Sequence, residues 1–155
     1  MSDASMMKRA IALSSTAARN GGGPFGAVVA MNDKILGQGV NSVVTGRDPT
    51  AHAEISAIRA ACASVGSHDL SGATIFASCE PCPMCLGAIW WARIDRIVFG
   101  NTRQDAARIG FDDAAIYEEV CRPITERKIP LERLCAGEAS EVFDAWHASS
   151  DRIAY

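Results

Sequence analysis

The sequence predicts an α/β fold, with a mixed five-stranded sheet covered by helices on both faces. From residue 73 onward, short apolar runs of strand length alternate with segments of helical period, which is typical of βαβ units and parallel strands. Earlier in the chain, two apolar runs are separated by only Asn32 and Asp33, a pair suited to a hairpin turn between antiparallel strands. A length of 155 residues is typical of one domain, so we expect a single domain over residues 1–155.

The first half of the chain is predicted to hold two helices and two strands. Met7, Ile11 and Ala18 mark one face of the first helix, and the glycine-rich run that follows ends it. Thr50 is a plausible N-cap for the second helix, whose Ile55 and Ile58 are expected to face the core. The expected bounds are a helix over 7–19, strands over 25–30 and 34–41, and a helix over 53–63.

The second half of the chain continues the alternation of strands and helices. The strands are short apolar runs, whereas the helices show apolar residues three and four positions apart. The segment 101–130 is less regular and contains one short helix. The expected strands are 73–77, 96–99 and 131–135, and the expected helices are 81–93, 114–121 and 139–149.

Composition disfavours several classes of protein. The net charge is −3, and no cluster of five or more Lys or Arg occurs, which disfavours a nucleic-acid substrate. No apolar run reaches the length of a membrane-spanning helix, and residues 1–9 lack the pattern of a signal peptide. We therefore expect a cytoplasmic protein with no membrane partner. In that compartment the six cysteines do not indicate a disulfide framework, and only Cys82 and Cys85 have a metal-like spacing.

Four residues form a pattern that predicts a catalytic zinc site. Cys82 and Cys85 are three positions apart at the start of a predicted helix, so their sulfurs share one face, where the helix dipole favours thiolates. With His52 they make three Zn²⁺ ligands, which leaves a fourth position open for water. Zinc can lower the pKa of that water from 15.7 to about 7, which makes hydroxide available. Glu54, two residues after His52, is then the expected general base and acid.

Other interpretations of the same residues remain open. A Cys-x-x-Cys pair alone is also found in redox sites and in structural zinc sites. A closed structural site would need a fourth ligand, for which His68 and Cys79 are the candidates. A non-catalytic zinc-binding protein is therefore the alternative from a different functional class. The combination of His-x-Glu with Pro-Cys-x-x-Cys favours a catalytic zinc site, because this combination is the signature of zinc deaminases.

Further stretches of the chain carry a resemblance to a known family. They are Gly22–Ala27, Asp48–Glu54, Ser78–Ala88, Trp91–Arg93, Gly110–Asp113, Ile116–Tyr117, and Tyr155 at the chain end. With them, the sequence resembles the cytidine deaminase-like superfamily and, within it, the bacterial guanine deaminases. The resemblance implies a three-layer α/β/α sandwich and the hydrolysis of guanine to xanthine and ammonia by zinc-bound hydroxide, with Glu54 as proton shuttle.

The resemblance also implies which residues meet a purine base. A carboxylate at Asp113 suits guanine, whose N1–H and amino group are both donors, and suits the N1 acceptor of adenine poorly. From the residues alone, Asp113 is equally an N-cap candidate, and Asn41 a candidate to end a strand. The resemblance implies that Asp113 is catalytic together with Glu54. The substrate-binding residues that it implies are Phe25, Asn41, Ala53, Trp91 and Tyr155, with Phe25 and Trp91 on either side of the flat base.

The resemblance further implies a homodimer. Its C-terminal tail, about residues 149–155, would cross to the partner subunit and place Tyr155 over that subunit's site. Other substrates remain possible: guanosine or another nucleoside, cytosine, a triazine and, least favoured, tRNA adenosine.

Overall fold

The structure is a computed structural model that describes residues 2–153. The chain divides into two compact units, Met1–Tyr117 and Glu118–Tyr155. The expectation of one domain over residues 1–155 stays a prediction.

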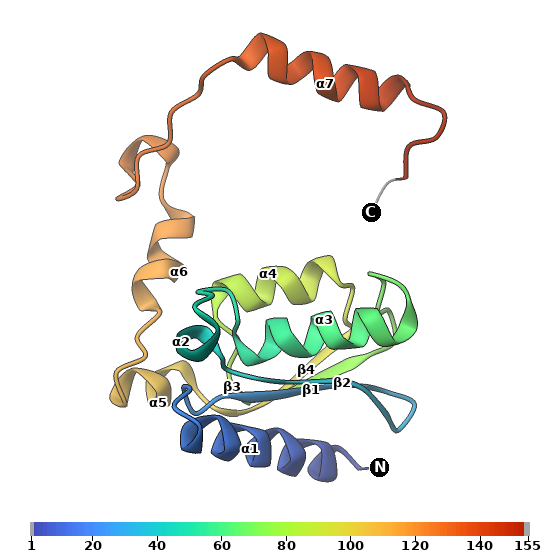
Figure 1. The fold of residues 1–155 in the computed structure, drawn as a ribbon. Coiled ribbons are helices and arrows are strands. Elements are labelled where there is room, and N and C mark those ends of the chain that lie inside the picture. Colours follow the sequence, from blue (N-terminus) through green and yellow to red (C-terminus); the bar gives the residue numbers. More distant parts are fainter. Residues whose placement is uncertain (1, 154–155) are drawn as a thin grey trace. The chain divides into compact units, whose positions relative to one another are not determined.

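A four-stranded mixed sheet forms the centre of the first unit (Figure 1), in the order β2-β1-β3-β4. Strand β1 pairs antiparallel with β2 and with β3, whereas β3 and β4 are parallel. The predicted hairpin is confirmed: Asn32 and Asp33 join β1 to β2 with positive φ values of 49° and 63°, as a tight hairpin turn requires. The strand bounds are Gly26–Met31 (β1), Lys34–Val40 (β2), Thr74–Cys79 (β3) and Arg96–Asn101 (β4).

The prediction of a fifth strand over residues 131–135 is wrong. That segment belongs to the second unit and has no strand conformation, while the four strands all lie in the first. Leu131 is 50 % exposed and Leu134 is 85 % exposed. A strand needs a neighbour for its backbone hydrogen bonds, and no described segment pairs with this one.

Helices cover both faces of the sheet (Figure 1), as predicted. Helix α1 (Asp3–Arg19) packs on one face, and α3 (Ala53–Val65) and α4 (Pro83–Trp91) lie over the other. Successive residues of a strand point to opposite faces, so β1 supplies both cores. Val28 and Ala30 belong to the core under α1, whereas Ala27 and Val29 belong to the core under α3.

The buried face of α1 differs by one residue from the predicted one. Met6, Ala10 and Ala17 are buried, whereas Ile11 is 51 % exposed. One residue corresponds to a rotation of about 100° around the helix axis. The predicted face of Met7, Ile11 and Ala18 is therefore the neighbouring one.

Helix α3 lies directly on strand β2 because two glycines allow it. A Cβ atom at Gly37 or Gly39 would overlap the backbone of α3. Ile55 and Ile58 of α3 are buried, as predicted. This close contact fixes the first turn of α3 beside the sheet.

Further helices follow in the chain, apart from α2, which precedes α3. Helices α2 (Val43–Gly46) and α5 (Arg103–Arg108) were not predicted, whereas α6 (Ala114–Cys121) has its predicted bounds. A 3₁₀ turn, Ile124–Glu126, and helix α7 (Ala136–Ala148) follow, and none of the described residues from 118 onward is buried. Within residues 2–153, none of the helices is long and apolar enough to cross a membrane.

Candidate active site

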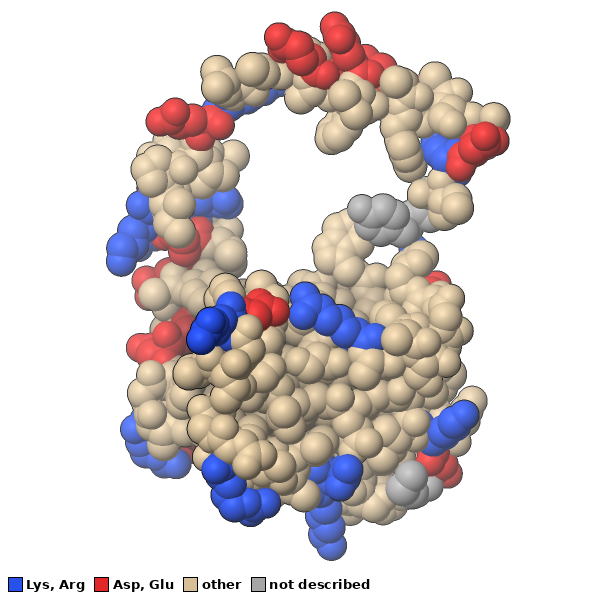
Figure 2. Space-filling view, in the orientation of Figure 1, with Lys and Arg blue, Asp and Glu red and all other residues tan. Residues whose placement is uncertain are grey.

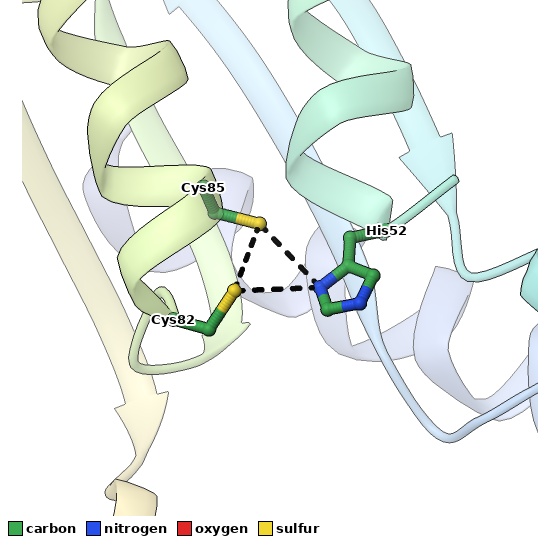
Figure 3. Close-up of side chains that lie close together, drawn as sticks. All are labelled: His52, Cys82 and Cys85. Carbon is green, nitrogen blue, oxygen red and sulfur yellow. Dashed lines mark hydrogen bonds between the residues drawn. The ribbon is translucent and has the colours of Figure 1, made fainter. Parts of the chain in front are cut away.

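Three side chains with metal-binding atoms converge at the N-termini of two helices (Figure 3). His52 is the N-cap of α3, so Thr50 does not have that role, and Cys82 is the N-cap of α4. Neither side chain caps its own helix by a hydrogen bond. Instead, His52 Nδ1 lies 3.6 Å from Cys82 Sγ and 3.5 Å from Cys85 Sγ, and the two sulfurs are 3.6 Å apart.

This spacing fits a tetrahedral zinc ion. Bond lengths of about 2.3 Å for Zn–S and about 2.0–2.1 Å for Zn–N place two sulfurs about 3.8 Å apart, and a sulfur and a nitrogen about 3.6 Å apart. Among the residues described, these three are the one group of this kind whose ligand atoms all lie within 4.8 Å of one another. Neither His68 nor Cys79, the candidate fourth ligands, joins the group, and Cys79 Sγ donates to the backbone oxygen of Thr102.

The two thiols have opposite tendencies to ionise. The hydrogen bond from Cys85 and the neighbouring His52 lower the pKa of Cys82 to about 4, against the effect of burial. The hydrogen bond to Cys82 and burial raise the pKa of Cys85. One thiolate is therefore available at neutral pH before a metal binds, and thiolate is the form that binds zinc.

Glu54 lies in the first turn of α3, two residues after His52. Its side chain is only 7 % exposed and lines the same cavity as His52 and Cys82. Burial raises the pKa of Glu54 above its usual value. A carboxylate with a raised pKa accepts a proton more readily than an exposed glutamate, as a general base must.

These residues open onto a cavity of about 450 Å³ in the first unit. Ligand pockets in proteins commonly have volumes of about 300–1,000 Å³, so a small flat molecule would fit. The cavity brings together six of the predicted residues: Phe25, Asn41, His52, Glu54, Cys82 and Asp113.

Asn41 lines the cavity, and its side-chain oxygen is already hydrogen-bonded. It follows strand β2 and is 8 % exposed. Its Oδ1 accepts hydrogen bonds from the backbone N–H of Gly23, at 3.3 Å, and of Val43, at 3.4 Å. The two bonds fix the orientation of the amide, which leaves the Nδ2 group to donate to a ligand. The residue therefore serves the turn after β2 and remains available to a substrate.

Phe25 contacts a second aromatic ring that was not predicted. The rings of Phe25 and Phe111 meet edge to face, with centroids 4.9 Å apart and an angle of 89° between their planes. Phe111 also lines the cavity. The segment Gly110–Asp113 carries the resemblance, but Phe111 comes from a part of the sequence far from Phe25, so no local pattern indicates their contact.

Asp113 lines the cavity, and its carboxylate accepts no hydrogen bond from another described residue. Asp113 immediately precedes α6, but the side chain that accepts from the start of this helix is that of Asp112, whose Oδ1 accepts the N–H of Ala114 at 2.9 Å. Burial raises the pKa of Asp113, while Arg103 acts in the opposite direction.

Three of the predicted substrate residues are not among those that line the cavity. Trp91 ends α4 and is 65 % exposed. Cys82 and Trp91 are nine positions apart, which is about 13 Å along a helix, and the stacking of Trp91 on a base stays a prediction. Ala53 is buried and absent from the lining, and Tyr155 lies outside the described residues.

Arg103 is a further residue at the cavity that was not predicted. It begins α5, whose N-cap Thr102 exchanges hydrogen bonds with Asp105 in a capping box. The sequence does carry that signal, a threonine followed three residues later by an aspartate.

Comparisons with known proteins find similarity to deaminases. The sequence model of a protein family, the cytidine and deoxycytidylate deaminase zinc-binding region, matches residues 1–101 of the chain. The guanine deaminase of Bacillus subtilis (strain 168) is 43 % identical over 156 residues, which cover 100 % of both chains. An X-ray structure of guanine deaminase from Bacillus subtilis superimposes with a TM-score of 0.96, over 100 % of this chain and 99 % of that one.

Two other similarities cover less of the chain. A guanine deaminase from Nitrosomonas europaea is 34 % identical with a TM-score of 0.69, over 72 % of this chain and 65 % of that one. A tRNA-specific adenosine deaminase of Buchnera aphidicola is 40 % identical over 109 residues, which cover 70 % of this chain and 72 % of that protein.

Proposed function

Because the chain belongs to the cytidine and deoxycytidylate deaminase zinc-binding family, we propose that it is a zinc-dependent enzyme that hydrolyses guanine to xanthine and ammonia. One observation carries the proposal: a single cavity contains the His–Cys–Cys cluster, the buried Glu54 and the unengaged carboxylate of Asp113. The similarity to a guanine deaminase over the full length of both chains supports this substrate.

His52, Cys82 and Cys85 would hold the zinc ion. When bound, zinc supplies an open fourth position at which a water molecule is activated for attack on the carbon that carries the amino group. The N-cap positions of α3 and α4 suit this role, because the positive ends of both helix dipoles favour the thiolates.

Glu54 would move the protons of the reaction. It accepts a proton from the attacking water and delivers it to a ring nitrogen of guanine. It then transfers the second proton to the leaving amine, so that water and guanine give xanthine and ammonia. The raised pKa of Glu54 favours the first step, because its carboxylate accepts a proton more readily than that of an exposed glutamate.

The other cavity residues would orient the base. Asn41 donates from Nδ2 to an acceptor of the purine, and the Phe25 ring packs against its face. Asp113 accepts from the N–H edge of guanine. Adenine would place its N1 lone pair against the same carboxylate, which leaves both acceptors without a donor and disfavours binding.

We also propose a homodimer in which the tail of about residues 149–155 covers a partner's cavity with Tyr155. In support, the described residues of the second unit have no core of their own. Val142, Phe143 and Trp146 of α7 are 66 %, 78 % and 49 % exposed. Apolar surface of this kind commonly marks an interaction site.

Deamination of tRNA adenosine is the second candidate, because a tRNA-specific adenosine deaminase matches 70 % of the chain. The net charge of −3 disfavours it. Over the elements of the first unit visible in Figure 2, Lys and Arg side chains stand in separate groups and form no continuous basic patch. A tRNA ligand would need such a patch to contact its phosphates.

Ammonia release from a panel of substrates tests the proposal. The zinc-loaded protein is incubated with guanine, guanosine, adenine, cytosine and tRNA at several salt concentrations. We expect turnover of guanine with little dependence on salt, because the base is neutral. Preferential turnover of tRNA, falling steeply with salt as phosphate contacts are screened, would instead support the second candidate. No turnover of any substrate would favour a non-catalytic zinc protein.

A further inference from the structure

We propose that Tyr117 is a positioning residue that fixes the Asp113 carboxylate relative to the metal-binding loop. The inference rests on the proposed function, in which Asp113 meets the N–H edge of guanine. Tyr117 would set the distance between the metal ligands and the Asp113 carboxylate, which contact different parts of the substrate.

The position of Asp113 depends on its backbone. Its carboxylate receives no hydrogen bond from other groups of residues 2–153, so no neighbouring donor holds it in place. Its backbone oxygen, by contrast, accepts the N–H of Ile116 at 2.9 Å and of Tyr117 at 3.3 Å, as the first turn of α6. Whatever anchors this turn therefore also places the carboxylate.

Tyr117 supplies the anchor. It lies one turn after Asp113, and its hydroxyl donates a hydrogen bond of 3.1 Å to the backbone oxygen of Pro81. Pro81 immediately precedes the metal ligand Cys82. One side chain thus connects the turn that carries Asp113 to the loop that carries a ligand, although the two are 36 residues apart in sequence.

A second set of contacts holds the Tyr117 ring. The Arg103 guanidinium lies over the ring, 4.8 Å from its centroid, as in a cation–π interaction. The backbone N–H of Arg103 donates to Glu80 Oε2 at 3.0 Å, and the N–H of Glu80 donates to the backbone oxygen of Asn101 at 2.8 Å. Glu80, Arg103 and Tyr117 therefore tie the metal-binding loop to the start of α5 and to α6.

The hydroxyl keeps its proton over the whole physiological pH range. Burial raises the pKa of Tyr117 above its usual value of 10.0. Since the bond to Pro81 needs the hydroxyl as donor, it persists at any pH at which the enzyme would work. Loss of the hydroxyl should therefore act through the position of Asp113, without involving a change in charge.

The test compares Tyr117→Phe with the wild-type enzyme and a matched control. Tyr117→Phe removes the hydroxyl and keeps the ring under Arg103. We expect the KM for guanine to rise about fivefold, the value of one hydrogen bond, with kcat within twofold and zinc content unchanged. Thr16→Val is the control, because Thr16 also donates a hydroxyl to a backbone oxygen, that of Ala12, on the exposed surface of α1. It should leave both kinetic constants unchanged.

A second variant covers the possibility that Tyr117→Phe folds poorly. Arg103→Gln removes the cation over the ring but keeps the backbone bond to Glu80, and we expect the KM to rise about twofold. A lowered melting temperature with an unchanged KM in both variants would show a purely structural role and overturn the inference. The wild-type enzyme would still deaminate guanine in that case, whereas failure of the proposed function would abolish wild-type turnover itself.

Discussion

In residues 2–117, large apolar side chains such as Val28, Leu70 and Ile75 are fully buried between the sheet and its helices. In residues 118–153, no described residue is buried, and Leu134 and Phe143 are 85 % and 78 % exposed. The first unit has its own core and contains all the described candidate site residues. The second lacks the buried apolar surface that stabilises a small domain. The contrast shows that the candidate site lies in the unit that has a buried core.

The largest expected effect tests whether the chemistry belongs to the first unit. Glu54→Gln keeps the shape of the side chain but cannot accept the proton of the attacking water. We expect guanine turnover to fall by about 10³-fold, within the range for general acid–base catalysis, with zinc content and melting temperature retained. Steady-state kinetics, metal analysis and thermal unfolding of the same preparation measure these three quantities. A variant with normal turnover would contradict the proton-shuttle role.

A pair of core and surface substitutions measures the contrast between the units directly. Leu70→Ala removes a fully buried side chain, so the free energy of unfolding should fall by about 3 kcal/mol. Leu134→Ala makes the same chemical change at an 85 % exposed position and should change the free energy of unfolding by less than about 0.5 kcal/mol. Urea unfolding at protein concentrations at which the chain is monomeric gives both values. A large loss for Leu134→Ala would show that the second unit has a core after all.

A smaller effect is expected at the substrate-reading carboxylate. Asp113→Asn should lower kcat/KM for guanine about 30-fold, because it removes a charged acceptor from donors of the base. Burial raises the pKa of Asp113 above 3.8, so as the pH falls the carboxylate is lost earlier than in an ordinary aspartate. The wild-type KM for guanine should therefore rise in the acid range.

The same pH profile supplies the control for that prediction. Since asparagine does not titrate, the KM of Asp113→Asn should stay constant over the pH range in which the wild-type value rises. A parallel rise in both proteins would assign the titration to another group.

The smallest expected effect concerns the second unit. Truncation after Ser149 removes the tail that is proposed to cover a partner's cavity, and guanine turnover should fall about tenfold while zinc content stays the same. Tyr155→Ala in the full-length chain separates the tyrosine from the rest of the tail. Unchanged kinetics in both proteins would remove the covering role.

Sequence reasoning succeeded where the signal is local. The alternation of short and long apolar segments gave the mixed sheet, and Asn32-Asp33 gave the hairpin, because both depend on neighbouring residues. The spacing of Cys82 and Cys85 has the same local character. Their approach to His52 is a tertiary feature, but the joint motif indicates it, and the structure brings the three together.

Prediction from the sequence failed where the structure depends on contacts between segments far apart in the chain. The apolar run at 131–135 resembles a strand whether or not another strand is available to pair with it. The choice between two neighbouring faces of α1 depends on its fit to the sheet, where a Cβ at Gly26 would overlap the backbone of α1 at Ala10. The contacts of Phe111 with Phe25 and of Tyr117 with Pro81 join segments far apart in sequence.

A structure of zinc-loaded Glu54→Gln with guanine bound tests the central claim most directly, because slow turnover should retain the base. We expect the amino-bearing carbon to lie next to the metal held by His52, Cys82 and Cys85. The N–H edge should lie about 2.7–3.2 Å from the Asp113 carboxylate. Guanine bound with another edge toward Asp113, or outside this cavity, would contradict the account.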